Sequence, residues 1–186
     1  MHTQETSLNR QKLEQVVLFF LEKINNVHLG RTKLMKLLYY VDFDHYERHG
    51  RSITCAKYRK LPHGPVPEKA DAVIKEMVSS GIVKSVNVPR GDFKQNRLIT
   101  SSGEFDASLF SGDELQTLEA VANKWEHFTA KQIEDASHKE APWASTDDGK
   151  AIDYELAEYR TSLEAEPIDD WLRKSAHFSK LVESLV

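Results

Sequence analysis

Three side chains near residue 45 have the types and spacing that could hold a metal ion. His45 and His49 are four residues apart, which on a helix places both imidazoles on one face, and Asp42 precedes them. This arrangement matches no zinc motif, and the polar end of an exposed helix accounts for it equally well. We therefore predict no metal site.

The single cysteine, Cys55, could act as a nucleophile if a neighbouring base activated it. No flanking signature marks its thiol as reactive, and the chain lacks G-x-S-x-G, a phosphate-binding glycine loop and H-E-x-x-H. We predict no catalytic residue, no cofactor and no enzymatic activity. One cysteine excludes an internal disulfide, and with no recognisable secretion signal we expect a cytoplasmic protein.

The spacing of apolar residues predicts a mainly helical α+β fold with a small antiparallel sheet. Apolar positions every three or four residues predict a helix over 13–24. The next helix, with Thr32 as its N-cap and Gly50 at its end, is apolar on most sides and should form the centre of the core. Capping boxes at 111–114 and 129–132 predict two further helix starts.

The predicted β structure lies between these helices. β-favouring residues at 52–61 predict a short strand, and the prolines at 62–67 predict a stiff loop. Pro67 should be the first residue of a helix that runs to Ser80. Two β-favouring segments within 82–100, separated by a turn that contains proline and glycine, predict a hairpin.

The last third of the chain predicts short helices. Pro142 should end the helix before it, and the apolar pattern at 152–159 predicts another. A final helix should begin at Pro167. We expect a main domain over 8–160 and a helical extension over 164–186 packed on it. No apolar run approaches the roughly 20 residues that a membrane span needs, so we expect no membrane partner.

Charge is distributed unevenly along the chain. Residues 31–100 carry a net charge of +7, whereas residues 101–186 carry −11. The two parts could attract each other across an intramolecular interface. Alternatively, the basic part offers a face to an acidic protein or a nucleic acid, and the acidic part offers one to a basic partner.

Two segments combine polar, aromatic and conformationally restricted residues in an unusual way: SHKEAPW at 137–143 and KLMKLLYY at 33–40. Tyr58-Arg59 and HGPV at 63–66 lie between them in the sequence. An architectural role explains each segment, because a histidine can bond the carbonyls at a helix end and a tryptophan can pack beneath it. They could equally mark a shared interaction surface, since interfaces favour aromatic and arginine side chains.

In this order, the segments resemble the Panacea domain of SocA-like bacterial and phage antitoxins. The resemblance covers roughly residues 8–160 and includes the Y-R…G-P-V stretch at 58–66, Gly81-Ile82 and Ile152-Asp153-Tyr154. It implies an antitoxin that neutralises a cognate protein toxin by direct binding, either alone or as an adaptor to a AAA+ protease.

The partner-binding residues that the resemblance implies lie within the matching motifs. Tyrosine and tryptophan side chains would serve as anchors, and basic side chains would steer an acidic toxin surface. The full set is Lys33, Lys36, Tyr39, Tyr40, Tyr58, Arg59, Lys60, Gly64, Pro65, His138, Glu140 and Trp143.

A second hypothesis is a winged-helix-like DNA-binding transcriptional regulator. The helix at 68–80 and the hairpin at 82–100 match the order of elements in that module, and Arg90 and Lys94 would suit phosphate contacts. Against this hypothesis, Asp71 and Glu76 leave the helix almost neutral, whereas a groove-reading helix usually carries more positive charge.

Overall fold

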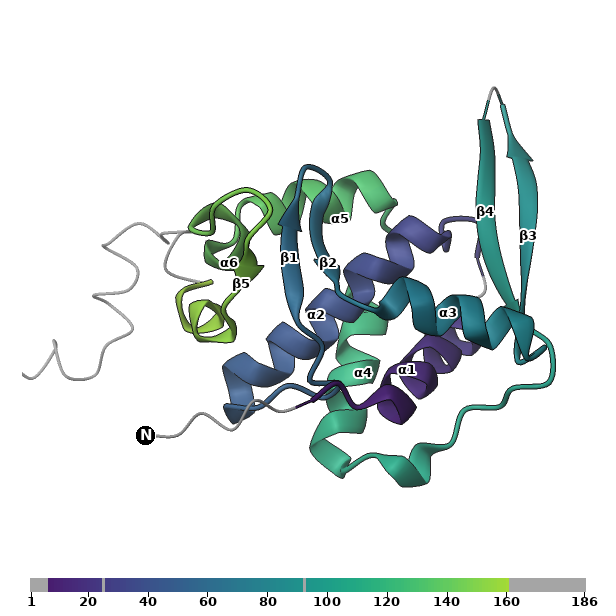
Figure 1. Ribbon diagram of the computed structural model, residues 1–186, viewed down its shortest axis with the longest axis horizontal. Coiled ribbons are helices and arrows are strands. Elements are labelled where there is room, and N and C mark those ends of the chain that lie inside the picture. The colour runs from purple at the N-terminus through teal and green to yellow at the C-terminus, as the bar shows by residue number, and fades with distance from the viewer. Residues whose placement is uncertain (1–6, 25, 92, 161–186) are drawn as a thin grey trace, which may run out of the picture.

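The computed structural model describes residues 7–24, 26–91 and 93–160 and has the mainly helical α+β fold that the sequence predicted. Figure 1 shows its elements, which are α1 (Arg10–Lys23), α2 (Arg31–His49), β1 (Tyr58–Leu61), β2 (Gly64–Pro67), α3 (Ala70–Ser79), β3 (Val83–Arg90), β4 (Phe93–Thr100), η1 (Ala107–Leu109), α4 (Gly112–Trp125), α5 (Ala130–His138), α6 (Ala141–Ala144), β5 (Ala151–Ile152) and η2 (Tyr154–Tyr159). The final helix expected from Pro167 and the extension over 164–186 lie outside the described residues.

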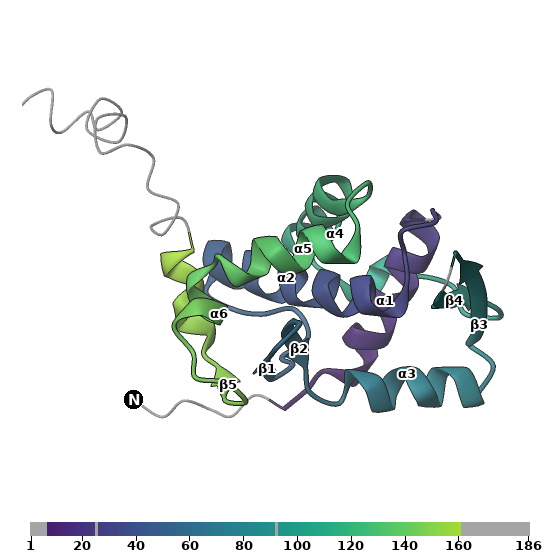
Figure 2. The ribbon, with the colours of Figure 1, turned by 90° about the horizontal axis from the view of Figure 1, so that it is seen from above.

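Helix α2 is the centre of the fold. Helices α4 and α5 cover one side of it, and the β1–β2 hairpin and α3 lie on the other (Figure 2). All residues from Lys33 to His45 are buried, which confirms the central position predicted from the sequence. Gly50 ends the helix in the left-handed conformation, with φ at 66°. The predicted N-cap was wrong, because Gly30 precedes the first turn and Thr32 lies inside it.

The segment predicted as a strand over 52–61 forms a strand only from Tyr58 onward. The carboxylate of Asp42, on α2, accepts hydrogen bonds from the backbone N–H groups of Ile53 and Thr54, at 2.9 and 2.7 Å. It also accepts one from the Thr54 hydroxyl. Cys55 has φ at 56°, which a regular strand does not permit. The prediction was wrong before Tyr58 because a buried carboxylate, rather than a neighbouring strand, satisfies this backbone.

The proline segment predicted as a loop over 62–67 is a turn at Pro62 and His63, followed by strand β2 from Gly64 to Pro67. It pairs antiparallel with β1 in the sheet order β2-β1-β5, with Pro65 opposite Lys60 and Pro67 opposite Tyr58. Proline is tolerated here because β2 is an edge strand. Pro67 was also wrongly placed as a helix start, since α3 begins at Ala70.

The hairpin and both capping boxes are confirmed. Strands β3 and β4 pair over their full length, and the capping-box bonds at Ser111 and Thr129 are both present. Pro142 lies within the first turn of α6, whereas α5 already ends at His138, so the predicted stop was misplaced. The helix expected at 152–159 is a 3-10 helix that follows the short strand β5. None of the described helices is both long and apolar enough to cross a bilayer.

Replacing Asp42 tests how far the fold depends on this carboxylate. Besides the bonds to residues 53 and 54, Asp42 accepts a bond from the Tyr58 hydroxyl at 2.8 Å. Asp42→Ala leaves buried donors without an acceptor, so we expect the free energy of unfolding to fall by about 3 kcal/mol or more in urea titrations. The exposed Asp147→Ala is the control, with an expected change within about 0.5 kcal/mol. Equal stability of the two variants would show that Asp42 does not hold the segment.

Candidate functional site

Gly64 is the point at which three of the singled-out segments meet. Its φ is 102°, a conformation that only glycine adopts readily. A Cβ atom at this position would lie 2.9 Å from Lys36 Nζ and 3.1 Å from Ser137 Oγ. The segments 33–40, 63–66 and 137–143 therefore pack against one another, and the glycine permits their close approach.

Lys36 ties the β1–β2 turn to α2. Its ammonium group is buried and donates a hydrogen bond to the His63 carbonyl. The Glu134 carboxylate of α5 lies 3.7 Å from the same Nζ atom. Burial lowers the pKa of Lys36, although Glu134 opposes that shift. One side chain thus connects three elements.

Lys33 performs the equivalent role one turn earlier. Its Nζ atom donates to the carbonyls of Glu126 and Phe128, both at 2.7 Å, where α4 ends and the chain turns toward α5. Burial lowers the pKa of Lys33 to about 8. Lys33 therefore fixes the α4–α5 turn against the start of α2.

Glu140 is held between Tyr39 and Arg160. It accepts a hydrogen bond from the Tyr39 hydroxyl at 2.8 Å and one from Arg160 Nη2 at 2.8 Å. Arg160 also pairs with Asp44 and, at 3.3 Å, with Glu47. Although burial lowers the pKa of Arg160, these carboxylates raise it above its usual value. The guanidinium is thus permanently charged and joins α2 to the end of η2.

Sequence reasoning missed Arg160, although a signal was present. Asp44 and Glu47 lie on the helix that the sequence places at the centre of the core, and buried carboxylates require a cation. Arg160 is the one basic residue between Lys150 and Arg173 in the sequence. Its pairing could not be predicted because nothing local places residue 160 beside residue 44.

Trp143 lies at the outer edge of the place where segments 33–40, 63–66 and 137–143 pack together, which we call the Gly64 junction. Its ring stacks on His138 with centroids 3.9 Å apart, and Lys60 Nζ lies 4.1 Å from the ring centroid. The indole N–H donates to the Leu61 carbonyl at 3.2 Å. Trp143 is half-buried, and burial lowers the pKa of His138. The junction thus presents an aromatic edge beside a cation.

The three tyrosines expected as anchors lie in the core. Tyr39, Tyr40 and Tyr58 are fully buried, and the ring of Tyr39 contacts those of Tyr40 and Tyr58, with centroids 5.2 and 5.9 Å apart. Burial raises the pKa of each phenol. In this conformation they support the surface from beneath. Pro65 is also buried.

Arg59 and Lys60 are the remaining predicted partner-binding residues, and both lie on β1. The exposed Arg59 pairs with Glu68 at 2.7 Å and donates to the Gly149 carbonyl. Lys60 is half-buried and donates to the Thr146 carbonyl at 2.8 Å. Among the predicted residues, Arg59 is exposed, while Lys60, His138, Glu140 and Trp143 are partly exposed.

The residues considered as metal ligands do not form one site. His45 Nδ1 is 2.9 Å from Thr117 Oγ1, and its ring lies against that of His49. Asp42 is engaged with residues 53–58 instead. Within residues 7–24, 26–91 and 93–160, no group of three His, Cys, Asp or Glu side chains is arranged to hold a metal ion.

The elements of the DNA-binding hypothesis lie next to each other, but the acidic groups of α3 are engaged with the rest of the protein. Asp71 pairs with Arg31 at 2.6 Å, and Glu76 pairs with Arg10 at 2.5 Å. The Arg90 side chain, at the end of β3, lies outside the described residues.

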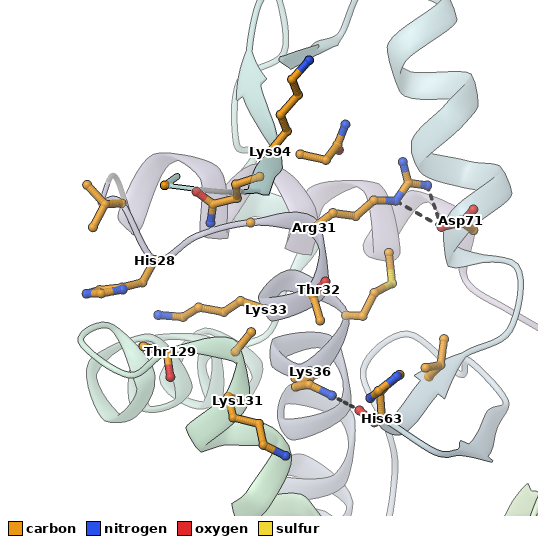
Figure 3. Close-up of a pocket in the computed structure, with 18 residues that line it drawn as sticks. His28, Arg31, Thr32, Lys33, Lys36, His63, Asp71, Lys94, Thr129 and Lys131 are labelled. Atoms are coloured by element: carbon orange, nitrogen blue, oxygen red, sulfur yellow. Dashed lines mark hydrogen bonds and ion pairs between the residues drawn. The ribbon is translucent and has the colours of Figure 1, made fainter. Parts of the chain in front are cut away.

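A groove of about 990 Å³ opens beside the start of α2. Figure 3 shows Lys94 on the β3–β4 hairpin and Lys131 on α5, with Lys33 and Lys36 between them on α2. His63 forms part of the wall, so the groove adjoins the Gly64 junction. This cavity was not anticipated from the sequence.

A known protein family matches the part of the chain that contains these segments. The family described as antitoxin SocA-like, Panacea domain, matches residues 34–144 of the 186. The chain belongs to this family. No curated protein and no solved structure matches it. The Panacea match begins inside α2 and ends with α6, so α1 and Arg160 lie outside it although both pack on α2.

Replacing Gly64 tests whether the close packing of the three segments depends on this glycine. Gly64→Ala introduces both an unfavourable φ and a contact with buried polar atoms, so we expect a loss of about 1–3 kcal/mol in the free energy of unfolding. Gly112→Ala is the matched control, because a Cβ atom there would have no other atom within 4 Å and the φ of Gly112 is not positive. That variant should be neutral or stabilised by up to about 1 kcal/mol. Equal effects would contradict the packing argument.

Lys33 should make stability depend on pH in the alkaline range. Its pKa is about 8 in the folded protein and 10.5 ordinarily, so the unfolded chain binds more protons between these values. The free energy of unfolding should therefore rise, through this group, as pH increases from 8 to 10.5. Buried tyrosines titrate in the opposite direction, so the measurement is the difference between the wild type and Lys33→Met in urea titrations. A pH-independent difference would contradict the assignment.

Proposed function

We propose that this Panacea-domain protein is an antitoxin that neutralises a cognate protein toxin by binding it directly. Family membership supports an antitoxin role. The observation that carries the proposal is the Gly64 junction, in which the family's segments form one packed unit with Trp143 and Lys60 at its edge. Neutralisation of this kind requires affinity and no chemical step.

The junction suits binding because its parts are held rigidly. The buried Lys36 and Gly64 and the partly exposed Glu140 hold the hairpin, α5 and α6 in place. A surface that is already ordered loses less conformational entropy when a partner docks. We assign direct contact to Arg59, Lys60 and Trp143 and positioning to the buried members of the set.

Delivery of the toxin to a AAA+ protease is a finer version of the same proposal. It predicts that the amount of toxin in the cell falls when the antitoxin is present, whereas simple sequestration leaves the amount unchanged. Immunoblotting of a tagged toxin during co-expression separates these two mechanisms.

The test begins with a tagged pull-down from the native host and expression of each stoichiometric partner alone. The proposal expects one partner that stops growth by itself and is rescued by co-expression of this protein. Trp143→Ala should weaken binding of that partner at least about tenfold in titration calorimetry, because aromatic anchors dominate interfaces. Ile99→Ala, an exposed apolar residue on the β3–β4 hairpin, is the control and should bind normally.

One result would overturn the proposal, and another would overturn only the assignment of the binding surface. If no partner is toxic when expressed alone and the protein instead retains DNA in gel-shift assays, the regulator hypothesis replaces it. If a toxin is found and both variants neutralise it equally, binding does not use the junction edge. Thermal unfolding of Trp143→Ala shows whether the fold is kept.

A further inference from the structure

The groove beside the start of α2 has two walls that come from distant parts of the chain. One wall is strand β4. Its residue Gln95 lies so close to Gly30 that a Cβ atom on residue 30 would be 2.8 Å from the side-chain amide nitrogen of Gln95. The opposite wall is the first turn of α5, beginning at Thr129. Arg31 and the first turn of α2 lie between them (Figure 3). Tertiary packing thus brings these three elements together around one groove.

The lining has an excess of positive charge. It contains five cationic side chains and one carboxylate, that of Asp71, which Arg31 already pairs. Lys131 is partly neutralised by Glu134 and Asp135 at 3.0 and 2.9 Å. Lys36 lies 3.7 Å from the Glu134 carboxylate, so the charge that remains comes mainly from Lys33 and Lys94.

Lys33 and Lys36 are buried, so they would attract an anionic ligand through their electrostatic field and not by direct contact. The exposed fractions of Lys33 and Lys36 are 0% and 2%, so solvent and salt screen them little. Each donates to backbone carbonyls, which keeps the ammonium group in place. Lys94 is exposed, and 70% of the Lys131 side chain is exposed, so these two can touch a ligand directly.

Two helix starts add to the same field. Helix α2 begins after Gly30, which has no side chain to cap the first backbone N–H groups. Helix α5 begins at Ala130, also in the groove wall. The positive ends of both helices favour an anionic group between the walls.

The rest of the lining favours a peptide over a nucleotide. Val27, Met35 and Val66 provide apolar contacts, while Thr32 and Gln95 provide hydrogen-bonding groups. Among the described residues that line the groove, none is a phenylalanine, tyrosine or tryptophan on which a base could stack. Carboxylates carried between aliphatic side chains fit this mixture of cations and apolar surface.

We propose that the groove binds an acidic segment of the protein partner, with Lys94 and Lys131 contacting its carboxylates. This inference rests on the proposed antitoxin function for the source of the segment, but the anionic site itself does not. It places a second contact region next to the Gly64 junction, because His63 borders both.

The test uses the full-length protein and a fluorescein-labelled decapeptide of alternating Glu and Leu, followed by fluorescence anisotropy. The wild type should bind this peptide, more weakly as salt is raised, and the Lys94→Glu/Lys131→Glu double variant should bind at least about tenfold more weakly. Lys84→Glu/Lys139→Glu is the matched control, with one change on the same hairpin and one just after α5, both outside the groove. It should bind within about twofold of the wild type.

Several results would overturn the inference. They are absence of peptide binding by the wild type, equal weakening in the two double variants, and displacement of the peptide by ATP at concentrations where inorganic phosphate and free glutamate have no effect. The last result would make the groove a nucleotide site.

A growth assay separates this inference from the proposed function. If a toxin is found and the Lys94→Glu/Lys131→Glu variant neutralises it like the wild type, the groove inference fails while the antitoxin function stands. If the peptide binds as expected but no toxic partner exists, the antitoxin function fails while the anionic site stands. Circular dichroism confirms that both double variants are folded.

Discussion

The burial of charged side chains on helix α2 is the constraint on which the rest of the structure depends. A buried charge without a partner costs several kcal/mol, so each one must hold another part of the chain. Lys33 holds the α4–α5 turn, and Lys36 holds the β1–β2 turn. Asp42 holds the segment after α2, and Asp44 holds Arg160. Four charges on one helix therefore fix four segments around it.

The same arrangement explains why the Panacea segments, far apart in sequence, meet at one place. Gly64 lets the hairpin approach Lys36 and Ser137 within contact distance, and Glu140 is bound by Tyr39 from below. Most of the motif residues are thus supports. The side chains that a partner could reach are few and lie at the edge of the junction and in the neighbouring groove, where a rigid support keeps them in position.

Local signals in the sequence were sufficient for much of the fold. Both capping boxes, the β3–β4 hairpin and the central position of α2 were predicted correctly, because each depends on residues a few positions apart. Two of the failures occurred where a distant group satisfied the backbone. Asp42 prevents a strand at residues 53 and 54, and pairing with β1 turns the proline segment into β2.

The sequence by itself determined the helical α+β class, the core helix and the family resemblance, since apolar periodicity and ordered motifs are properties of the chain read in one dimension. Only the tertiary structure decided which of the singled-out residues are buried supports and which are accessible. It also brought Arg160 to the carboxylates of α2 and created the basic groove between β4 and α5. The physical reason is that burial and electrostatic pairing depend on distances in space, which sequence separation does not specify.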